Sequence, residues 1–334
     1  MRYVVVGAGA VGGTVGGRLY DAGRDVVLVA RGKHAEAMRK DGLRLALPDR
    51  VATIKAPVLD SVREAKLGVG DVVLLATKTQ DTLAALADVE IAAAGGEVPI
   101  ACLQNGVANE RMALRRFRNV YGVVVMLPAV MLEPGRIDAQ GHPFSGLLDV
   151  GRVPTGTDET AARIASDFAA SGFVAVDVPD ILRWKYAKLL RNLGNAIEAL
   201  CGHDVDDTDW SIINDLDARM RDEAMACFRA GGISWVSDDE WTARRKDQVG
   251  WAPVEGRSRA GGSTWQSFAR GAGSVETDYL NGEISLLGRW YGIPTPVNTG
   301  LQRVVAQAVS EGRAPGSMTH EELLTAIDLK EPSP

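Results

Sequence analysis

Six residues near the N-terminus have the spacing of a phosphate-binding turn. Gly7-Ala8-Gly9-Ala10-Val11-Gly12 follows a short apolar run and opens a helical stretch. Without side chains at these glycines, the backbone can approach a pyrophosphate, whose charge is met by free N–H groups and the positive helix end. The pattern predicts a dinucleotide-binding site that includes all six residues.

The residue that follows the second predicted strand distinguishes an NAD site from an NADP site. An NAD site carries Asp or Glu about 20 residues beyond the glycines. This chain has Arg31 there, followed by Lys33 and His34 in a cationic cluster. A guanidinium can pair with a 2′-phosphate through two charge-assisted hydrogen bonds. The sequence therefore predicts NADP, with NADPH as its reduced form, rather than NAD.

Polar residues follow two further predicted strands. Lys78 comes after the strand-like run 71–77, and Asn105 comes shortly after 99–103. In an open parallel sheet, ligands bind at the carboxyl ends of strands near the point where the strand order reverses. We therefore expect an ammonium and an amide beside the nicotinamide, where both can contact cofactor and substrate.

The segment 180–200 is predicted to be one helix with a polar stripe. Lys185, Lys188, Asn192 and Asn195 recur along it at helical spacing. Asparagine is a poor interior helix residue because its amide competes with the backbone for hydrogen bonds, so the stripe indicates polar contacts. A lysine in a cleft can protonate a carbonyl oxygen as hydride arrives at the carbon. The stripe therefore predicts a proton donor.

Together these blocks resemble the ketopantoate reductases, also called 2-dehydropantoate 2-reductases. The resemblance covers most of the chain in family order, and its most specific blocks are 183–192 and 276–282. It implies a Rossmann domain followed by an all-helical domain, with substrate in the cleft between them and NADPH as reductant. Through the match Lys-Leu-Leu-x-Asn, it implies that Lys188, not Lys185, is the general acid.

The resemblance also implies roles for the remaining polar residues. Glu276 is expected to contact a substrate hydroxyl and the catalytic lysine, and thus joins Lys188 as a catalytic residue. In the family, a serine holds the substrate carboxylate, and the corresponding segment leaves two candidates for that serine. The expected substrate-binding residues are Lys78, Asn105, Asn192, Asn195 and either Ser263 or Thr264.

The chain departs from the family pattern among these substrate-binding residues. The family's second asparagine is Ala196 here, with Asn195 one position early, and an upstream asparagine is replaced by Gly261 or Ala260. Trp265 is bulkier than the family's methionine. Because the cofactor and acid residues are retained, the reaction type is expected to be conserved more firmly than the substrate.

The elements that carry these residues divide the chain in two. The first half alternates strand-like and helical stretches, which predicts an α/β fold with an N-terminal Rossmann doubly wound parallel sheet. The second half, which holds all seven tryptophans from Trp184 to Trp290, predicts a C-terminal all-helical domain. We expect an NADP-binding domain over 1–179 and a helical substrate and catalytic domain over 180–330. Strands are expected at 3–6, 25–30, 71–77, 99–103, 123–127, 146–150 and 174–178, and helices at 14–22, 80–87, 180–200, 215–230, 275–291 and 299–311.

One stretch, 237–262, has no regular pattern. Its mixed charges and several glycines fit either a loop over a cleft or a solvated surface excursion.

Composition limits the class of protein. The chain has 334 residues and a net charge of -6, so it lacks the basic excess that nucleic-acid binding requires. No apolar run approaches the roughly 20 residues that cross a bilayer, so we expect no membrane contact and a cytoplasmic location. Three cysteines and four histidines form no metal-binding pattern, so we expect no metal.

These observations predict an NADPH-dependent oxidoreductase that reduces a 2-oxo acid, specifically 2-dehydropantoate (ketopantoate) to pantoate in pantothenate biosynthesis. One alternative is a related reductase that acts on another 2-oxo acid or carbonyl compound of specialised metabolism. A second alternative is a non-catalytic NADP-sensing protein, which the intact Lys188, Asn192 and Glu276 disfavour because a sensor needs no proton donor. The expected partner is a small molecule, and the chain is expected to be a monomer or a homodimer.

Overall fold

The structure is a computed structural model that describes residues 1–131, 133–202, 210–257, 261–269, 271 and 275–327. It divides into two compact units: Met1–Lys185 with Val236–Arg259, and Tyr186–Trp235 with Ala260–Pro334. The division thus lies inside a helix rather than at 179/180, and one segment of the expected helical domain returns to the first unit. The side chain of Lys185 and the strand pairing of the returning segment, both described below, account for the difference.

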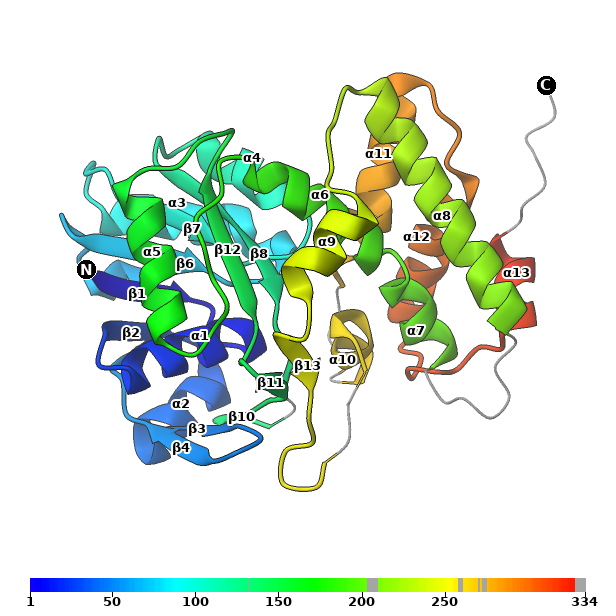
Figure 1. The fold of residues 1–334 in the computed structure, drawn as a ribbon. Coiled ribbons are helices and arrows are strands. Elements are labelled where there is room, and N and C mark those ends of the chain that lie inside the picture. Colours follow the sequence, from blue (N-terminus) through cyan, green and yellow to red (C-terminus); the bar gives the residue numbers. More distant parts are fainter. Residues whose placement is uncertain (132, 203–209, 258–260, 270, 272–274, 328–334) are drawn as a thin grey trace. The chain divides into compact units, whose positions relative to one another are not determined.

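A seven-stranded sheet forms the centre of the first unit (Figure 1). Its order is β12-β8-β7-β6-β1-β2-β5, with β12 antiparallel to its neighbour β8 and the other pairs parallel. The strand order reverses between β1 and β6, which is where a doubly wound sheet binds its ligand. The strands are β1 Arg2–Val6, β2 Asp25–Val29, β5 Val58–Leu59, β6 Asp71–Leu75, β7 Ile100–Cys102, β8 Val120–Met126 and β12 Leu147–Arg152.

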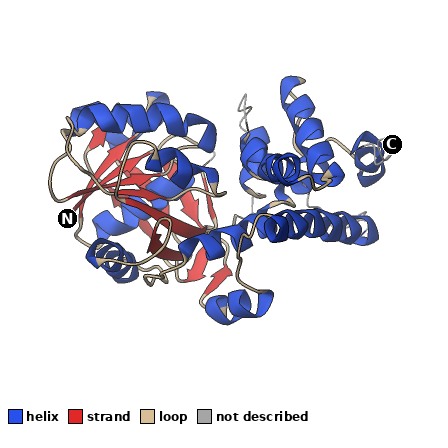
Figure 2. Ribbon diagram, turned by 90° about the horizontal axis from the view of Figure 1, so that it is seen from above, coloured by secondary structure: helices blue, strands red, loops and turns tan. Residues whose placement is uncertain are grey.

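Helices lie on both faces of this sheet, as Figure 2 shows. On one face, Tyr3 and Val5 of β1 share a buried cluster with Leu19 of α1 and Phe168 of α5. Fully burying such side chains contributes about 1.5–3 kcal/mol each. The Tyr3 hydroxyl donates to the carboxylate of buried Asp167 at 2.7 Å, so this face also satisfies its polar groups. The helices of the unit before α6 are α1 Ala10–Asp21, α2 Gly32–Asp41, α3 Thr82–Ala92, α4 Ala108–Leu114 and α5 Glu159–Ala170, with 3-10 turns η1 Val62–Ala65 and η2 Thr79–Asp81.

Short strands that the sequence pattern did not predict form two further sheets. One has the order β4-β3-β10-β9, and the other pairs β11 with β13. The predicted strand 174–178 is instead an extended segment that bonds to β12, for example from Leu148 N to Val174 O at 2.8 Å. The short strands are β3 Leu43–Ala46, β4 Val51–Ile54, β9 Ala129–Val130, β10 Arg136–Ala139, β11 Gly141–Pro143 and β13 Val249–Trp251.

The segment that begins at Val236 belongs to the first unit and carries α9 (Asp238–Arg245) and β13. Arg244 donates through two nitrogens to the buried carboxylate of Asp149, at 2.6 and 2.8 Å. This part of 237–262 is therefore neither a free loop nor a solvated excursion, since strand pairing and a buried ion pair fix it.

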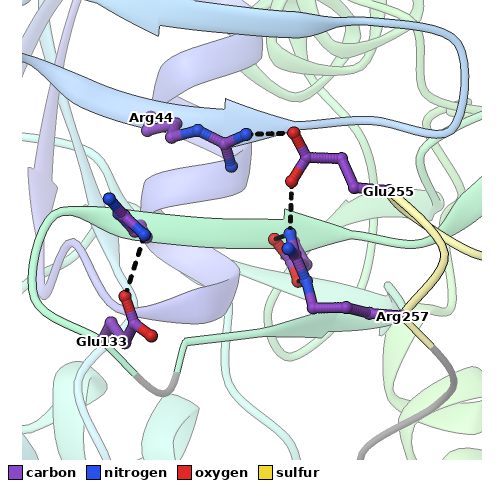
Figure 3. Close-up of polar contacts among 6 residues, drawn as sticks. Arg44, Glu133, Glu255 and Arg257 are labelled. Carbon is purple, nitrogen blue, oxygen red and sulfur yellow. Dashed lines mark hydrogen bonds and ion pairs between the residues drawn. The ribbon is translucent and has the colours of Figure 1, made fainter.

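A network of charges joins the same segment to the second sheet (Figure 3). Glu255 lies between Arg44 of β3 and Arg257, and it pairs with both. Arg257 also donates to both oxygens of Asp138 on β10, at 2.7 and 2.8 Å. These exposed pairs add little stability individually, but together they fix where the segment lies on the sheet.

In its described residues, the second unit is helical. The expected helix over 180–200 is broken: α6 ends at Asn192, and α7 begins at Asn195. No helix of the described residues is both long and apolar enough to cross a membrane. The helices are α6 Ile181–Asn192, which begins in the first unit, α7 Asn195–Cys201, α8 Trp210–Ala230, α10 Ser263–Ala269, η3 Glu276–Tyr279, α11 Asn281–Tyr291, α12 Pro296–Ser310 and α13 His320–Ile327.

Candidate active site

The glycine turn after β1 lies against the end of β6. A Cβ added at Gly7, whose φ is +100°, would lie 2.8 Å from the backbone nitrogen of Thr77, and a Cβ at Gly12 would collide with the carbonyl oxygen of Gly7. Both glycines are therefore required by the packing of the protein on itself. The turn and the strand end that leads to Lys78 consequently lie together.

Gly9 differs from these two glycines. A Cβ added there would meet no protein atom within 4 Å, and its φ of -72° suits any residue. The protein itself therefore does not require glycine at this position, whereas a phosphate group against the backbone would. Gly9 is the N-cap of α1 and provides no side-chain cap, so the first-turn N–H groups of Ala10, Val11 and Gly12 have no capping side chain. This turn fits a dinucleotide pyrophosphate.

Ala8 has a supporting place in the turn. It is buried, and its N–H donates to Val29 O at 3.0 Å. His34 Nδ1 accepts from the N–H of Gly135, so Nε2 carries the proton and donates to Ala8 O at 2.8 Å. The cluster that could face a 2′-phosphate is therefore limited to Arg31 and Lys33, because both ring nitrogens of His34 are bonded to the backbone and hold the turn instead.

Arg31 lies two residues after the end of β2, at the N-cap of α2. Its side chain is 78% exposed, with a nitrogen 3.6 Å from a carboxylate oxygen of Asp88. Asp88 pairs more closely with Arg63, at 2.6 Å. Lys33 is also exposed. The end of β2 therefore presents two cations and no acid of its own.

A hydrogen bond between a side chain and the backbone joins the segments that follow β6 and β7. The amide of Gln104 donates to the carbonyl oxygen of Thr77 at 2.8 Å, between the segments that carry Lys78 and Asn105. Lys78 is half-buried. Asn105 Oδ1 is buried and has no hydrogen-bond partner among the residues that the structure describes. An unpaired buried acceptor is costly, and an amide donor such as a nicotinamide carboxamide would satisfy it.

On α6, the two lysines of the predicted stripe have different surroundings. Lys185 is buried in an ion pair with Glu110, whereas Lys188, one turn later, is half-buried. Asn192 lies one further turn along, 4% exposed, and its Nδ2 has no partner among the described residues. An amide donor with no acceptor therefore lies on the same helix face as Lys188, where a carboxylate or carbonyl oxygen of a ligand could bond to it.

The break between α6 and α7 moves Asn195 off the predicted stripe. Leu193 and Gly194 form the break, and the carbonyl of Leu193 accepts from Asn281 Nδ2 at 3.3 Å. Asn195 Oδ1 lies instead near Gly262, at 3.6 Å from a Cβ added there. The structure therefore places Asn195 beside the start of α10.

Ser263 and Thr264 open α10, the first half-buried and the second buried. Just before them, Gly261 has a φ of +64°, and an added Cβ would lie 2.6 Å from the indole of Trp265. The two departures from the family pattern are therefore coupled, because the tryptophan ring occupies the space that an asparagine side chain at 261 would need. Ala260, the other candidate position, lies outside the described residues. Glu276 is buried at the start of η3.

The three cysteines carry no reactive thiolate. Burial, with a smaller contribution from the Glu110 carboxylate, raises the pKa of Cys102 well above its usual range. Burial also raises the pKa of half-buried Cys201 to about 12 and raises that of buried Cys227. Covalent catalysis by a thiolate at neutral pH therefore has no candidate in this chain.

Two family models match the chain. The model described as ketopantoate reductase PanE/ApbA matches residues 3–154, and the one described as its C-terminal part matches 180–309. A curated relative, the 2-dehydropantoate 2-reductase of Archaeoglobus fulgidus, is 30% identical over 91% of this chain and 96% of its own length. The chain belongs to the ketopantoate reductase family. It is therefore an oxidoreductase of an NAD(P)-dependent family.

Solved structures agree with this assignment. A PanE/ApbA family ketopantoate reductase from Ralstonia eutropha JMP134 is 30% identical, with a TM-score of 0.77 over 93% of this chain and 99% of the other. A D-mandelate dehydrogenase, solved with NADH and anilino(oxo)acetate, has a TM-score of 0.78 over the same shares but only 21% identity. The second likeness concerns the fold alone.

Sequence reasoning missed the supporting residues of the site. Glu110, Asn109 and Asn281 make buried hydrogen bonds or ion pairs that fix predicted ligand-binding segments. No spacing rule could have identified Glu110, because its partner is 75 positions away in sequence, Lys185. For Asn281, the only available signal was its place in the block that follows Glu276.

Proposed function

We propose that this protein uses NADPH to reduce a 2-oxo acid to a 2-hydroxy acid, with ketopantoate as the leading substrate. The proposal rests on the position of Asn192 one helical turn after Lys188. The buried amide nitrogen of Asn192 has no acceptor among the described residues. A proton donor and an unpaired amide donor, four residues apart on one helix face, suit a carbonyl with an adjacent carboxylate. Family membership supports the reaction type.

The first unit has the groups that a bound NADPH needs. The open backbone at Gly9 and the uncapped first turn of α1 would receive the pyrophosphate, and Arg31 with Lys33 would receive the 2′-phosphate. The half-buried Lys78 and the buried Oδ1 of Asn105 would contact the nicotinamide end and the substrate. NADPH supplies the hydride when bound.

Lys188 then protonates the oxygen of the substrate's carbonyl. As hydride reaches C2, negative charge develops on this oxygen, and an ammonium next to it stabilises charge that exists mainly in the transition state. Asn192 Nδ2 donates to an oxygen of the same substrate and orients it. Glu276, buried at the start of η3, accepts a hydrogen bond from the substrate's tail hydroxyl and helps to place the ammonium.

Hydroxyls at Ser263 or Thr264 donate to the substrate carboxylate, with Asn195 beside the same end of α10. The stacking of Trp265 on Gly261 favours a second candidate, a reductase of the same type for another 2-oxo acid. The indole occupies the space that an asparagine side chain at 261 would need, and it changes the shape of the surrounding surface.

The test is NADPH oxidation by the purified protein with a panel of 2-oxo acids, together with NADPH binding. We expect turnover with ketopantoate or a related 2-oxo acid and formation of one 2-hydroxy acid per NADPH consumed. Tight NADPH binding with no turnover on any carbonyl compound would instead support the sensor alternative.

A further inference from the structure

A buried ion pair in the first unit lies outside the groups assigned above. Lys185 Nζ lies 2.6 Å from Glu110 Oε1 on α4, and the two side chains are 2% and 0% exposed. The ammonium also donates to the carbonyl oxygens of Gln104, at 2.8 Å, and Val123, at 3.4 Å. It therefore joins the start of α6 to strand β8 and to the loop after β7.

Stability alone does not account for such a pair. Removing two charges from water costs about as much as their attraction returns, and apolar replacements of similar volume are often neutral or stabilising. The fold nevertheless makes room for the lysine. A Cβ added at Gly122 of β8 would lie 3.3 Å from Cδ of Lys185, so this strand lacks a side chain where the lysine stem passes.

The pair holds one side of a loop whose other side is also fixed. Lys185 holds the carbonyl of Gln104, and Asn109 Nδ2 donates to the carbonyl of Asn105 at 3.2 Å. The side chain of Gln104 is fixed as well, through its bond to Thr77 O. The backbone carbonyls of Gln104 and Asn105 are thus both held, while the buried side-chain oxygen Oδ1 of Asn105 has no partner among the described residues.

We propose that the Lys185–Glu110 pair positions Asn105 for the ligand. The ammonium fixes the Gln104 carbonyl, and Glu110 supplies the countercharge that keeps the ammonium buried. Lys185 is then a positioning residue that acts through Asn105, distinct from the proton donor Lys188. The proposal rests on the proposed function in assigning Asn105 to nicotinamide and substrate, whereas the fixing of the loop is testable without substrate.

Two variants separate positioning from stability. Glu110→Gln leaves a buried ammonium without countercharge but keeps its bond to Gln104, so we expect Tm to fall by about 10 °C. The double variant Lys185→Met with Glu110→Gln removes both charges, so Tm should return to within about 3 °C of wild type. The double variant should nevertheless have the lower kcat, reduced about 10- to 100-fold, because the Gln104 carbonyl is no longer held. If the pair were purely structural, the less stable Glu110→Gln variant would have the lower kcat, and the double variant would have a kcat close to that of wild type.

Amide hydrogen exchange in peptide 103–109 gives a readout that needs no substrate. We expect exchange to be at least about tenfold faster in the double variant than in wild type. The control is Asp71→Asn, which neutralises the bidentate partner of Arg2 at the opposite, amino ends of β1 and β6. It should change neither exchange in 103–109 nor kcat.

A double variant with wild-type exchange and kcat would overturn the positioning role. If wild type reduces no 2-oxo acid, the proposed function fails, and the exchange measurement still decides whether the pair holds the loop.

Discussion

Asn281 Nδ2 donates a hydrogen bond to the carbonyl oxygen of Leu193 at 3.3 Å, at the point where α6 gives way to α7. The same amide bonds to Asn298 Oδ1 at 3.1 Å, so a fixed and buried side chain holds the helix break. The break sets where Asn192 ends one helix and Asn195 begins the next. The two asparagines therefore serve different parts of the second unit.

Replacing Asn281 should affect both stability and catalysis. Asn281→Ala leaves the Leu193 carbonyl and Asn298 Oδ1 without this donor, so we expect a loss of about 2–4 kcal/mol in the free energy of unfolding. The displaced Asn192 should also raise KM for the 2-oxo acid. Urea unfolding and steady-state kinetics measure the two effects. A large stability loss with unchanged KM would show that the break does not position the substrate-binding amide.

The two kinds of glycine in the turn after β1 give a paired prediction. Gly9→Val adds a side chain where no protein atom lies within 4 Å, so Tm should stay within about 2 °C while NADPH binding weakens by at least about tenfold. Gly12→Ala drives a methyl group into the Gly7 carbonyl and should lower Tm. Thermal melts and NADPH fluorescence titration check both. Unchanged NADPH affinity in Gly9→Val would place the pyrophosphate elsewhere.

Arg31 should set the cofactor preference. Charge-assisted hydrogen bonds are worth about 1.5–3 kcal/mol, so Arg31→Ala should weaken NADPH about 10- to 100-fold and change NADH by less than about threefold. Arg63→Ala is the matched control, because Arg63 also pairs with Asp88 but does not follow β2. It should leave the NADPH to NADH ratio unchanged. Equal losses of both cofactors in Arg31→Ala would refute 2′-phosphate recognition by Arg31.

Lys188 should be the proton donor. Lys188→Ala should lower kcat by at least about 100-fold with NADPH affinity retained. We also expect wild-type kcat to fall at high pH, since a general acid must be protonated to act, and we expect Lys188→Ala to lack this fall. The buried Lys185 differs, because its loss leaves Glu110 unpaired and must change stability. If kcat of Lys188→Ala still falls at high pH, another group is the proton donor.

Local signals predicted the parts of the site that depend on neighbouring residues. The glycine turn, Arg31 and the polar strand ends follow from residues close in sequence. Because β1, β6 and β7 are parallel neighbours, the segments that follow them lie together at the carboxyl ends of the strands. The break after Asn192 could not be read from helical spacing, because Lys185 and Asn195 fit the same period whether or not the helix continues.

Long-range contacts decided the rest of the fold. The strands β3, β4 and β9 to β11 have two to four residues each, too few for a periodic pattern, and their pairing stabilises them. The returning segment is held by Arg244 on Asp149 and by β13 on β11, contacts between residues about 100 positions apart. The burial of Lys185 depends equally on Glu110, which no local pattern connects to it.

The most direct test of the proposed activity compares two substrates that differ only in a hydroxyl. Glu276 is buried, and an ionised carboxylate only accepts hydrogen bonds, so it suits a tail that carries a hydroxyl donor better than an apolar tail. We therefore expect kcat/KM with NADPH to be higher for ketopantoate than for 2-oxoisovalerate. We expect a preference of at least about tenfold, and we expect Glu276→Ala to remove it. A preference for 2-oxoisovalerate that survives Glu276→Ala would contradict the hydroxyl contact, and activity only on carbonyl compounds that lack a carboxylate would contradict the 2-oxo acid assignment itself.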